Sequence, residues 1–361
     1  MNPLTKLLVL PLFLIFFLSG VTLTLASEPY LTILVYHRFG EIKYPTTNIS
    51  EERFCEQMEY LKEENYQVLS LEEVRQLYQK KQDFPDKAVL ITIDDAYRSV
   101  YKVAYPILKN FGYPFTVFLY SESIEKRYPA MMNLDMIQEM KQAGVTFGNH
   151  THTHPHLGIP AVEMSEEEYR FWVREEIRTC QSFLHRHGIE SYSIAFPYGE
   201  YNQIILEEAE NLGYNLMFSQ NAGSVAIPLN QQVTLPRQAI AGENMNLNLF
   251  KQRLACPPLI ISSPQPFPGL LKSVNPEEFA ARLVYPEKYR PGVINMFVSE
   301  LGGLQADFNP ETGWIRSINQ KKLTRALNRV TITAKEKNSS QFALTSWLIC
   351  LPPPWEITQE N

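Results

Sequence analysis

The chain has 361 residues and a formal net charge of -6. It is long enough to bury a large core, with room for one barrel-sized domain and a smaller unit. The acidic balance and the lack of a basic stripe argue against nucleic acid as a partner. Four scattered cysteines are too few for a disulfide scaffold, although a bridge between Cys256 and Cys350 stays open.

Residues 1–26 have the pattern of an export signal. Lys6 supplies a positive charge, residues 7–18 are almost continuously apolar, and Thr24-Leu25-Ala26 offers small residues for cleavage. The alternative is an uncleaved membrane anchor, because the apolar stretch is nearly long enough to span a bilayer. The pattern predicts export to the periplasm, the cell surface or the medium, with any membrane anchoring through this segment only. No oligomeric state is predicted.

From residue 30 to about 255, short β-rich runs alternate with helical patterns. The predicted strands are 31–37, 67–71, 88–94, 115–121, 145–150, 192–197, 216–219 and 233–235. The predicted helices lie near 51–65, 72–81, 97–109, 134–143, 166–187 and 202–212, with a capping box at Ser165 and Glu168. This α/β order predicts a parallel sheet that forms a distorted or incomplete (β/α) barrel.

The composition changes after residue 255. Five prolines in residues 256–268 predict a linker. Short alternating runs at 292–298, 314–318, 329–334 and 342–351 then predict a small all-β accessory domain over 269–355. That segment contains no histidine and should contribute no metal ligand. The predicted barrel domain therefore covers residues 27–255.

A histidine cluster carries the strongest chemical signal. His150-Thr-His-Thr-His154 follows a predicted strand, about 55 residues after Asp94-Asp95. Two imidazoles four residues apart and one carboxylate make a His₂Asp set, and three protein ligands with an open fourth position suit a catalytic zinc-type site. Asp94, beside the candidate ligand Asp95, is a candidate base. The alternative is that the paired aspartates only cap the next helix.

Other polar residues fall at or just beyond the carboxyl ends of predicted strands, and these are His37, Tyr198 and Arg237. In (β/α) barrels the active site is built at this rim, from residues far apart in the sequence. We therefore expect these three residues to converge with the aspartates and histidines on one end of the barrel.

These motifs resemble those of the polysaccharide deacetylases, the NodB-homology domain of carbohydrate esterase family 4. The family's Thr-Phe-Asp-Asp motif corresponds to Thr92-Ile93-Asp94-Asp95, and its His-Ser/Thr-x-x-His motif to His150-Thr151-His152-Thr153-His154. Val35-Tyr36-His37-Arg38 and Tyr44-Pro45-Thr46-Thr47-Asn48 are similar to one bacterial branch of these enzymes. The resemblance covers roughly residues 30–255.

Two family motifs are changed. Ala195-Phe196-Pro197-Tyr198 lacks the arginine of the family's Arg-x-Pro-Tyr/Phe, and residues 244–254 contain no counterpart of its Leu-x-x-His. Arg237 is the candidate source of the missing guanidinium, although it could equally be structural. In both changes the sequence resembles the branch that acts on biofilm polysaccharides of the poly-N-acetylglucosamine type.

The resemblance implies a metal-dependent hydrolase that removes N-acetyl groups from an N-acetylhexosamine polysaccharide, with water activated by the metal. The ligands of Zn²⁺, or of another divalent transition metal, would be Asp95, His150 and His154. Asp94 would be the base, and the backbone N–H of Tyr198 a donor to the oxyanion. His37 is the candidate acid for the departing amine, or else a hydrogen-bonded core histidine.

Two other functions stay open. The same attack serves esters, so the enzyme could be an O-deacetylase of another extracellular glycan. A non-catalytic carbohydrate-binding protein could also retain the barrel. The presence of Asp94 together with the three candidate ligands argues against a pure binder, because a binder needs no base for water.

Overall fold

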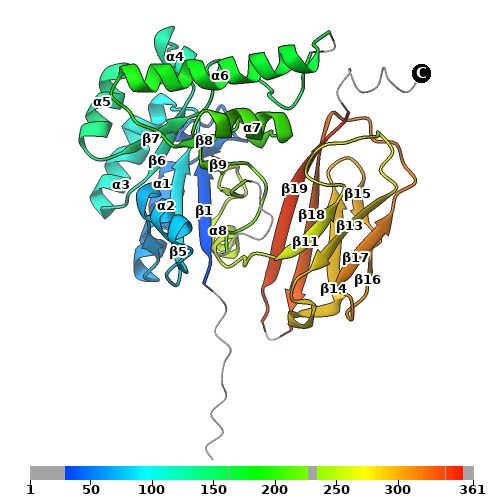
Figure 1. Cartoon of the computed structure of the whole chain (residues 1–361). Helices are drawn as coiled ribbons and strands as arrows, with labels where there is room; N and C mark the ends of the chain where they lie inside the picture. The colour runs from blue at the N-terminus through cyan, green and yellow to red at the C-terminus, as the bar shows by residue number, and fades with distance from the viewer. Residues whose placement is uncertain (1–28, 162, 227–233, 338, 353–361) are drawn as a thin grey trace, which may run out of the picture.

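The computed structural model describes residues 29–161, 163–226, 234–337 and 339–352. Figure 1 shows two parts side by side, a curled sheet with its helices and a β-sandwich made by the C-terminal strands. The predicted signal or anchor over 1–26 lies outside the described residues. Within the described ranges, no helix combines the length and the apolar character needed to cross a bilayer.

The larger part is a parallel sheet in the order β10-β1-β5-β6-β7-β8-β9, with β4 beside β5. Its strands are β1 (Leu31–Tyr36), β4 (Gln67–Val68), β5 (Ala88–Ile93), β6 (Thr116–Leu119), β7 (Thr146–Asn149), β8 (Ser193–Ala195), β9 (Leu216–Phe218) and β10 (Gln238–Ala239). Every residue of β1 and β5 is buried, because the sheet is covered on both faces and needs continuous apolar strands. A short pair, β2 (Arg38–Phe39) and β3 (Asn48–Ile49), follows β1.

The two ends of the curled sheet are joined by irregular contacts. Leu235 forms a parallel bridge with Phe218 of β9, and β10 pairs with β1 only three residues further on. Of the predicted strand over 233–235, Val233 lies outside the described residues and Leu235 pairs with β9 as an isolated bridge, while a further strand, β10, pairs with β1. The predicted distorted (β/α) barrel is confirmed.

Helices cover the outside of the sheet (Figure 1). They are α1 (Glu51–Glu63), α2 (Leu71–Lys80), α3 (Tyr105–Phe111), α4 (Ser121–Glu125), α5 (Leu134–Gln142), α6 (Glu166–Arg186), α7 (Gln203–Asn211) and α8 (Leu247–Leu254). A π-helical turn, η1 (Val100–Ala104), precedes α3 within the helix predicted near 97–109. The predicted capping box of Ser165 and Glu168 begins α6, whereas α4 and α8 were not predicted.

The C-terminal strands form two sheets, in the orders β11-β13-β17-β16 and β12-β19-β18-β14-β15. The strands are β11 (Ile261–Gln265), β12 (Gly269–Leu270), β13 (Glu278–Leu283), β14 (Tyr289–Val298), β15 (Gly302–Leu304), β16 (Asp307–Phe308), β17 (Trp314–Ile318), β18 (Leu327–Glu336) and β19 (Phe342–Cys350). Pairing is antiparallel except between β12 and β19. Side chains of both sheets share one buried core.

One part of the domain prediction needs correction. Residues 256–268 were expected to form a linker, but Ile261–Gln265 belong to the sandwich as β11. The other domain boundaries stay predictions. Strand β19 packs on the barrel, because Leu348 and Cys350 share a buried cluster with Tyr201 and other barrel residues. Cys256 and Cys350, for which a bridge was left open, are both free thiols.

Gly148 in β7 is a position where the sheet has no room for a side chain. A Cβ atom there would overlap the ring of Phe118. Gly148→Ala should lower the free energy of unfolding by about 1–3 kcal/mol, because a buried ring must move. Gly303→Ala is the matched control, since nothing lies within 4 Å of a Cβ at Gly303. Urea unfolding measures both variants, and equal midpoints would contradict the prediction.

Candidate metal centre and active site

The carboxyl ends of β5 and β7 bring three candidate ligand atoms together. Oδ1 of Asp95 lies 3.3 Å from Nε2 of His150 and 3.1 Å from Nε2 of His154. Across the described residues, these three form the one group of His, Cys, Asp or Glu side chains with metal-ligand spacing, with all ligand atoms within 4.8 Å of one another. The structure therefore brings together the three residues that the sequence predicted as ligands.

The chemistry of this group fits a divalent metal. Oδ1 of Asp95 is buried without a hydrogen-bond partner, a state that costs free energy unless something satisfies it. Donors bound at about 2.0–2.2 Å in a tetrahedral zinc site lie roughly 3.3 Å apart, close to the observed separations. Nδ1 of His150 lies 2.6 Å from the carbonyl oxygen of Ala195 and must donate to it, which leaves Nε2 free as a ligand.

The backbone around these residues is left-handed at several non-glycine positions. The φ angles are 72° at Asp95, 62° at Ala96, 68° at Thr151, 60° at His154 and 56° at Tyr198, which makes half of the ten non-glycine residues with positive φ in the described chain. Such conformations cost about 1–3 kcal/mol each and persist only where the surroundings hold them. Because these strained residues are concentrated at the rim, we infer that contacts with the surrounding fold hold their side chains in defined positions.

Two residues that the sequence reasoning missed hold the histidine turn. Asn149 accepts a hydrogen bond from the backbone N–H of Thr151 at 2.7 Å. Glu176 of α6 accepts two bonds from Thr153, from the backbone N–H and from the hydroxyl, each at 2.9 Å. Asn149 stands next to the histidine motif, but its neighbours give no sign of its role, and Glu176 lies among other glutamates of a helix.

Asp94 and Arg237 form a fully buried ion pair beside the ligand group. Nη1 and Nη2 of Arg237 donate to Oδ1 and Oδ2 of Asp94 at 2.8 and 2.7 Å, and both side chains are inaccessible to solvent. Burial raises the pKa of Asp94, but the opposing effects of Arg237 and of the neighbouring imidazoles are together larger and hold that pKa below its usual range. Asp94 is therefore an ionised carboxylate at neutral pH.

His37 lies next to Asp94. Its Nε2 is 4.0 Å from Oδ2 of Asp94, and its Nδ1 is buried without a hydrogen-bond partner. Burial lowers the pKa of His37, more than the neighbouring aspartates raise it. The imidazole is thus neutral at pH 7, and Nδ1 does not have the hydrogen bond that a satisfied core histidine would have.

Aromatic rings line the group on its outer side. The ring of Tyr198, which is 43% exposed, stands edge-on to His154 at 4.8 Å and stacks flat on His156 at 4.0 Å. The ring of Tyr120 lies 5.3 Å from that of His154. His156 itself bonds to the buried carboxylate of Glu200 at 2.7 Å, so it is not part of the ligand group. The exposed Tyr198 ring offers a flat face next to the ligands.

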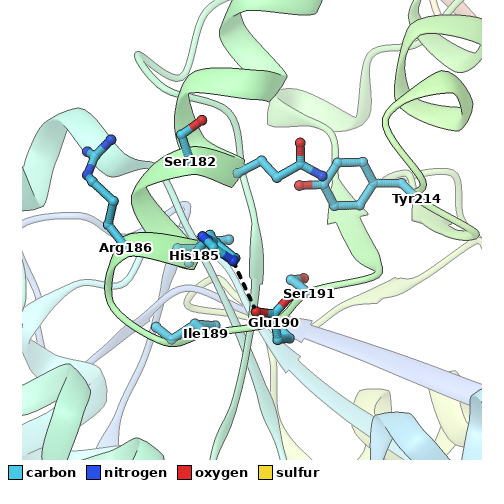
Figure 2. A pocket seen from close by; sticks show the side chains of 9 residues that line it. Ser182, His185, Arg186, Ile189, Glu190, Ser191 and Tyr214 are labelled. Carbon is cyan, nitrogen blue, oxygen red and sulfur yellow. Dashed lines mark ion pairs between the residues drawn. The ribbon is translucent and has the colours of Figure 1, made fainter.

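A pocket lies away from this rim, beside the C-terminal end of α6. Figure 2 shows it beside the end of α6, where His185 faces Glu190 at 3.6 Å and Tyr214 closes one side. Residues 189–191 lead into the amino end of β8, whereas the ligand group follows the carboxyl ends of β5 and β7. The pocket therefore belongs to the opposite end of the sheet and has no part in the site described above.

Residues 81–217 match the polysaccharide deacetylase family model. The barrel part of the chain is thus similar to polysaccharide deacetylases. The putative polysaccharide deacetylase YxkH of Bacillus subtilis (strain 168) is 26% identical over 196 residues, which cover 54% of this chain and 66% of that protein. The poly-beta-1,6-N-acetyl-D-glucosamine N-deacetylase of Escherichia coli (strain K12) is 26% identical over 236 residues, 55% of this chain and 34% of that protein. The chain thus spans less than two thirds of either relative.

A solved structure shows the same fold. The Streptococcus pyogenes deacetylase PplD, in complex with acetate, is 28% identical with a TM-score of 0.56, and the match covers 63% of this chain and 99% of that one. The structural match therefore covers nearly all of that deacetylase, whereas more than a third of this chain has no counterpart in it.

His150→Ala should remove most of the bound metal after dialysis, because it deletes one of three protein ligands. His152→Ala is the matched control from the same segment, since His152 bonds to Ser121 at 2.8 Å and is not in the ligand group. Elemental analysis of both purified variants measures the loss. Full occupancy in His150→Ala would contradict the ligand assignment.

Proposed function

We propose that this protein is a metal-dependent hydrolase that removes N-acetyl groups from an exported N-acetylhexosamine polysaccharide of the poly-N-acetylglucosamine type. The observation that carries the proposal is the pairing of the Asp95, His150 and His154 group with an ionised Asp94 that is held by Arg237. The E. coli relative, whose name states this activity, supports the choice of substrate. The predicted export signal supports a site of action outside the cytoplasm.

Asp95, His150 and His154 are proposed to hold Zn²⁺ or another divalent transition metal. When bound, such a metal supplies a Lewis acid that polarises the acetamide carbonyl and lowers the pKa of a water molecule. The chain's own residues move the protons. Asp94 accepts a proton from the water that attacks the carbonyl carbon, and Arg237 fixes the position of its carboxylate.

The remaining steps involve His37 and Tyr198. The backbone N–H of Tyr198 donates to the carbonyl oxygen as that oxygen gains negative charge. His37, which is neutral beforehand, takes up the proton that Asp94 accepted from the water and passes it to the sugar amine as the C–N bond breaks, so that Asp94 is ionised and His37 neutral again at the end. Because Nε2 of His37 lies 4.0 Å from Asp94, the proton that Asp94 takes up arrives beside the imidazole that must deliver one. The exposed ring of Tyr198 is suited to pack on the apolar face of a sugar.

One experiment distinguishes the proposed N-deacetylase from two alternatives, an O-deacetylase and a non-catalytic carbohydrate-binding protein. Acetate release is measured from chitooligosaccharides, from poly-N-acetylglucosamine and from an O-acetylated xylan, each with and without a chelator. We expect chelator-sensitive release from the N-acetylated substrates. Release from the xylan alone would favour an O-deacetylase, and binding of the polymers without any release would favour a carbohydrate-binding protein.

Asp94→Asn should retain the metal, because the three ligands are untouched, yet lower turnover about 10²–10⁴-fold through loss of the base. The substitution also leaves the buried Arg237 without its counter-ion, so circular dichroism and metal content must first show a folded, loaded variant. Acetate release then measures turnover. Near-normal turnover in such a variant would exclude Asp94 as the base.

A further inference from the structure

Arg329 reaches from the sandwich to the active-site end of the barrel. It lies in β18, and its Nη2 donates to the carbonyl oxygen of Tyr198 at 2.8 Å. Its Nε donates to Oδ1 of Asn221 at 3.3 Å. One side chain of the C-terminal part therefore holds two loops of the barrel, the turn after β8 and the segment after β9.

The turn after β8 needs such support. It is a 3₁₀ turn, η2 (Pro197–Gly199), in which Tyr198 has a φ of 56° and a ψ of 7°. Non-glycine residues adopt this conformation only at a cost in free energy. The turn is also pressed against the neighbouring loop, because a Cβ at Gly199 would overlap the backbone of Gln220. A charged donor on the carbonyl oxygen of Tyr198 stabilises the turn in this conformation.

The contact of Arg329 with Asn221 connects it to the Asp94–Arg237 ion pair. The carbonyl oxygen of Asn221 accepts the backbone N–H of Arg237 at 2.9 Å, and the side-chain amide of Asn221 donates to the hydroxyl of Tyr201 at 2.8 Å. Arg237 in turn holds Asp94. Arg329 thus contacts Tyr198 directly and contacts Asn221, whose carbonyl oxygen holds the backbone of Arg237, and it does so from the sandwich.

We propose that Arg329 is a positioning residue for the active site: it fixes the Tyr198 turn and the Asn221 loop against each other, so that the C-terminal sandwich completes the catalytic end of the barrel. The inference rests on the proposed function for its kinetic consequence only. Its structural consequence, a turn that opens more often when Arg329 is lost, does not depend on which reaction the enzyme performs.

The test uses the full chain with three variants. Arg329→Met keeps the aliphatic packing but removes every donor. Arg329→Lys restores a charged donor that cannot bridge both loops. Arg325→Met is the matched control, because Arg325 lies on the same sandwich and carries the same charge, and its guanidinium donates to the carbonyl oxygen of Ser299 within the sandwich, at 3.5 Å. Gln203→Ala is a second control, since Gln203 bonds across the interface to Pro268 and Leu270 but not to the turn.

Hydrogen–deuterium exchange of the peptide that contains residues 197–201 is the direct readout. We expect faster exchange in Arg329→Met, intermediate exchange in Arg329→Lys and wild-type exchange in both controls. Wild-type exchange in Arg329→Met, or the same acceleration in the controls, would overturn the proposal. If Arg329→Met does not fold, Arg329→Lys decides: accelerated exchange supports the proposal, and wild-type exchange overturns it.

Kinetics supply the second readout. In Arg329→Met we expect kcat on a soluble acetylated oligosaccharide to fall about tenfold or more, because a small displacement of a catalytic group has this effect. Metal content should stay at the wild-type level and KM should change less than kcat. An unchanged kcat in a variant with faster exchange would overturn the catalytic part of the proposal. If the wild type releases no acetate from any glycan, the proposed function fails, while the exchange measurement still decides the positioning role.

Discussion

The buried ion pair of Asp94 and Arg237 is the interaction on which the catalytic end depends. Moving two charges out of water costs several kcal/mol for each, and a bidentate geometry with further hydrogen bonds is needed to offset this. Arg237 has them, since Nε donates to the carbonyl oxygen of Ser219 at 2.8 Å and Nη1 reaches the hydroxyl of Thr92 at 3.2 Å. The same side chain thus ties β5 to the irregular segment that joins the two ends of the sheet. Loss of one partner costs about 3–5 kcal/mol, so the position of Asp94, the proposed base, and the closure of the barrel are linked.

The ligand group is held in place by residues outside it. Asn149 and Glu176 fix the turn that carries His154, and the carbonyl oxygen of Ala195 orients His150. Left-handed backbone at Asp95 and His154 shows that local preferences yield to these contacts. A metal bound here would meet ligands that need little rearrangement, which favours a defined geometry at the reacting carbonyl.

Much of the barrel could be predicted because its signals are local. Strands such as β5 are continuous apolar runs, and the motifs stand at their ends, so the convergence of Asp95 and His150 follows from parallel pairing. Contacts between distant segments could not be predicted in this way. For Arg237 the sequence left two interpretations open, a partner for the catalytic aspartate or a structural residue. The contact of Arg329 with Tyr198 joins residues 131 positions apart, and no local pattern signals it. Strand β11 was not predicted, because Pro264 within it is typical of a linker. Proline is tolerated there because β11 is an edge strand of its sheet.

We propose that the rim beside the Asp94–Arg237 pair is a single-metal hydrolytic site that two parts of the chain build together. Anomalous X-ray diffraction from crystals grown with zinc tests this most directly, because it locates the metal without assuming an activity. We expect one strong peak within about 2.0–2.2 Å of Asp95, His150 and His154 together. A peak bound by other residues, or none at this group in crystals that hold zinc elsewhere, would contradict it.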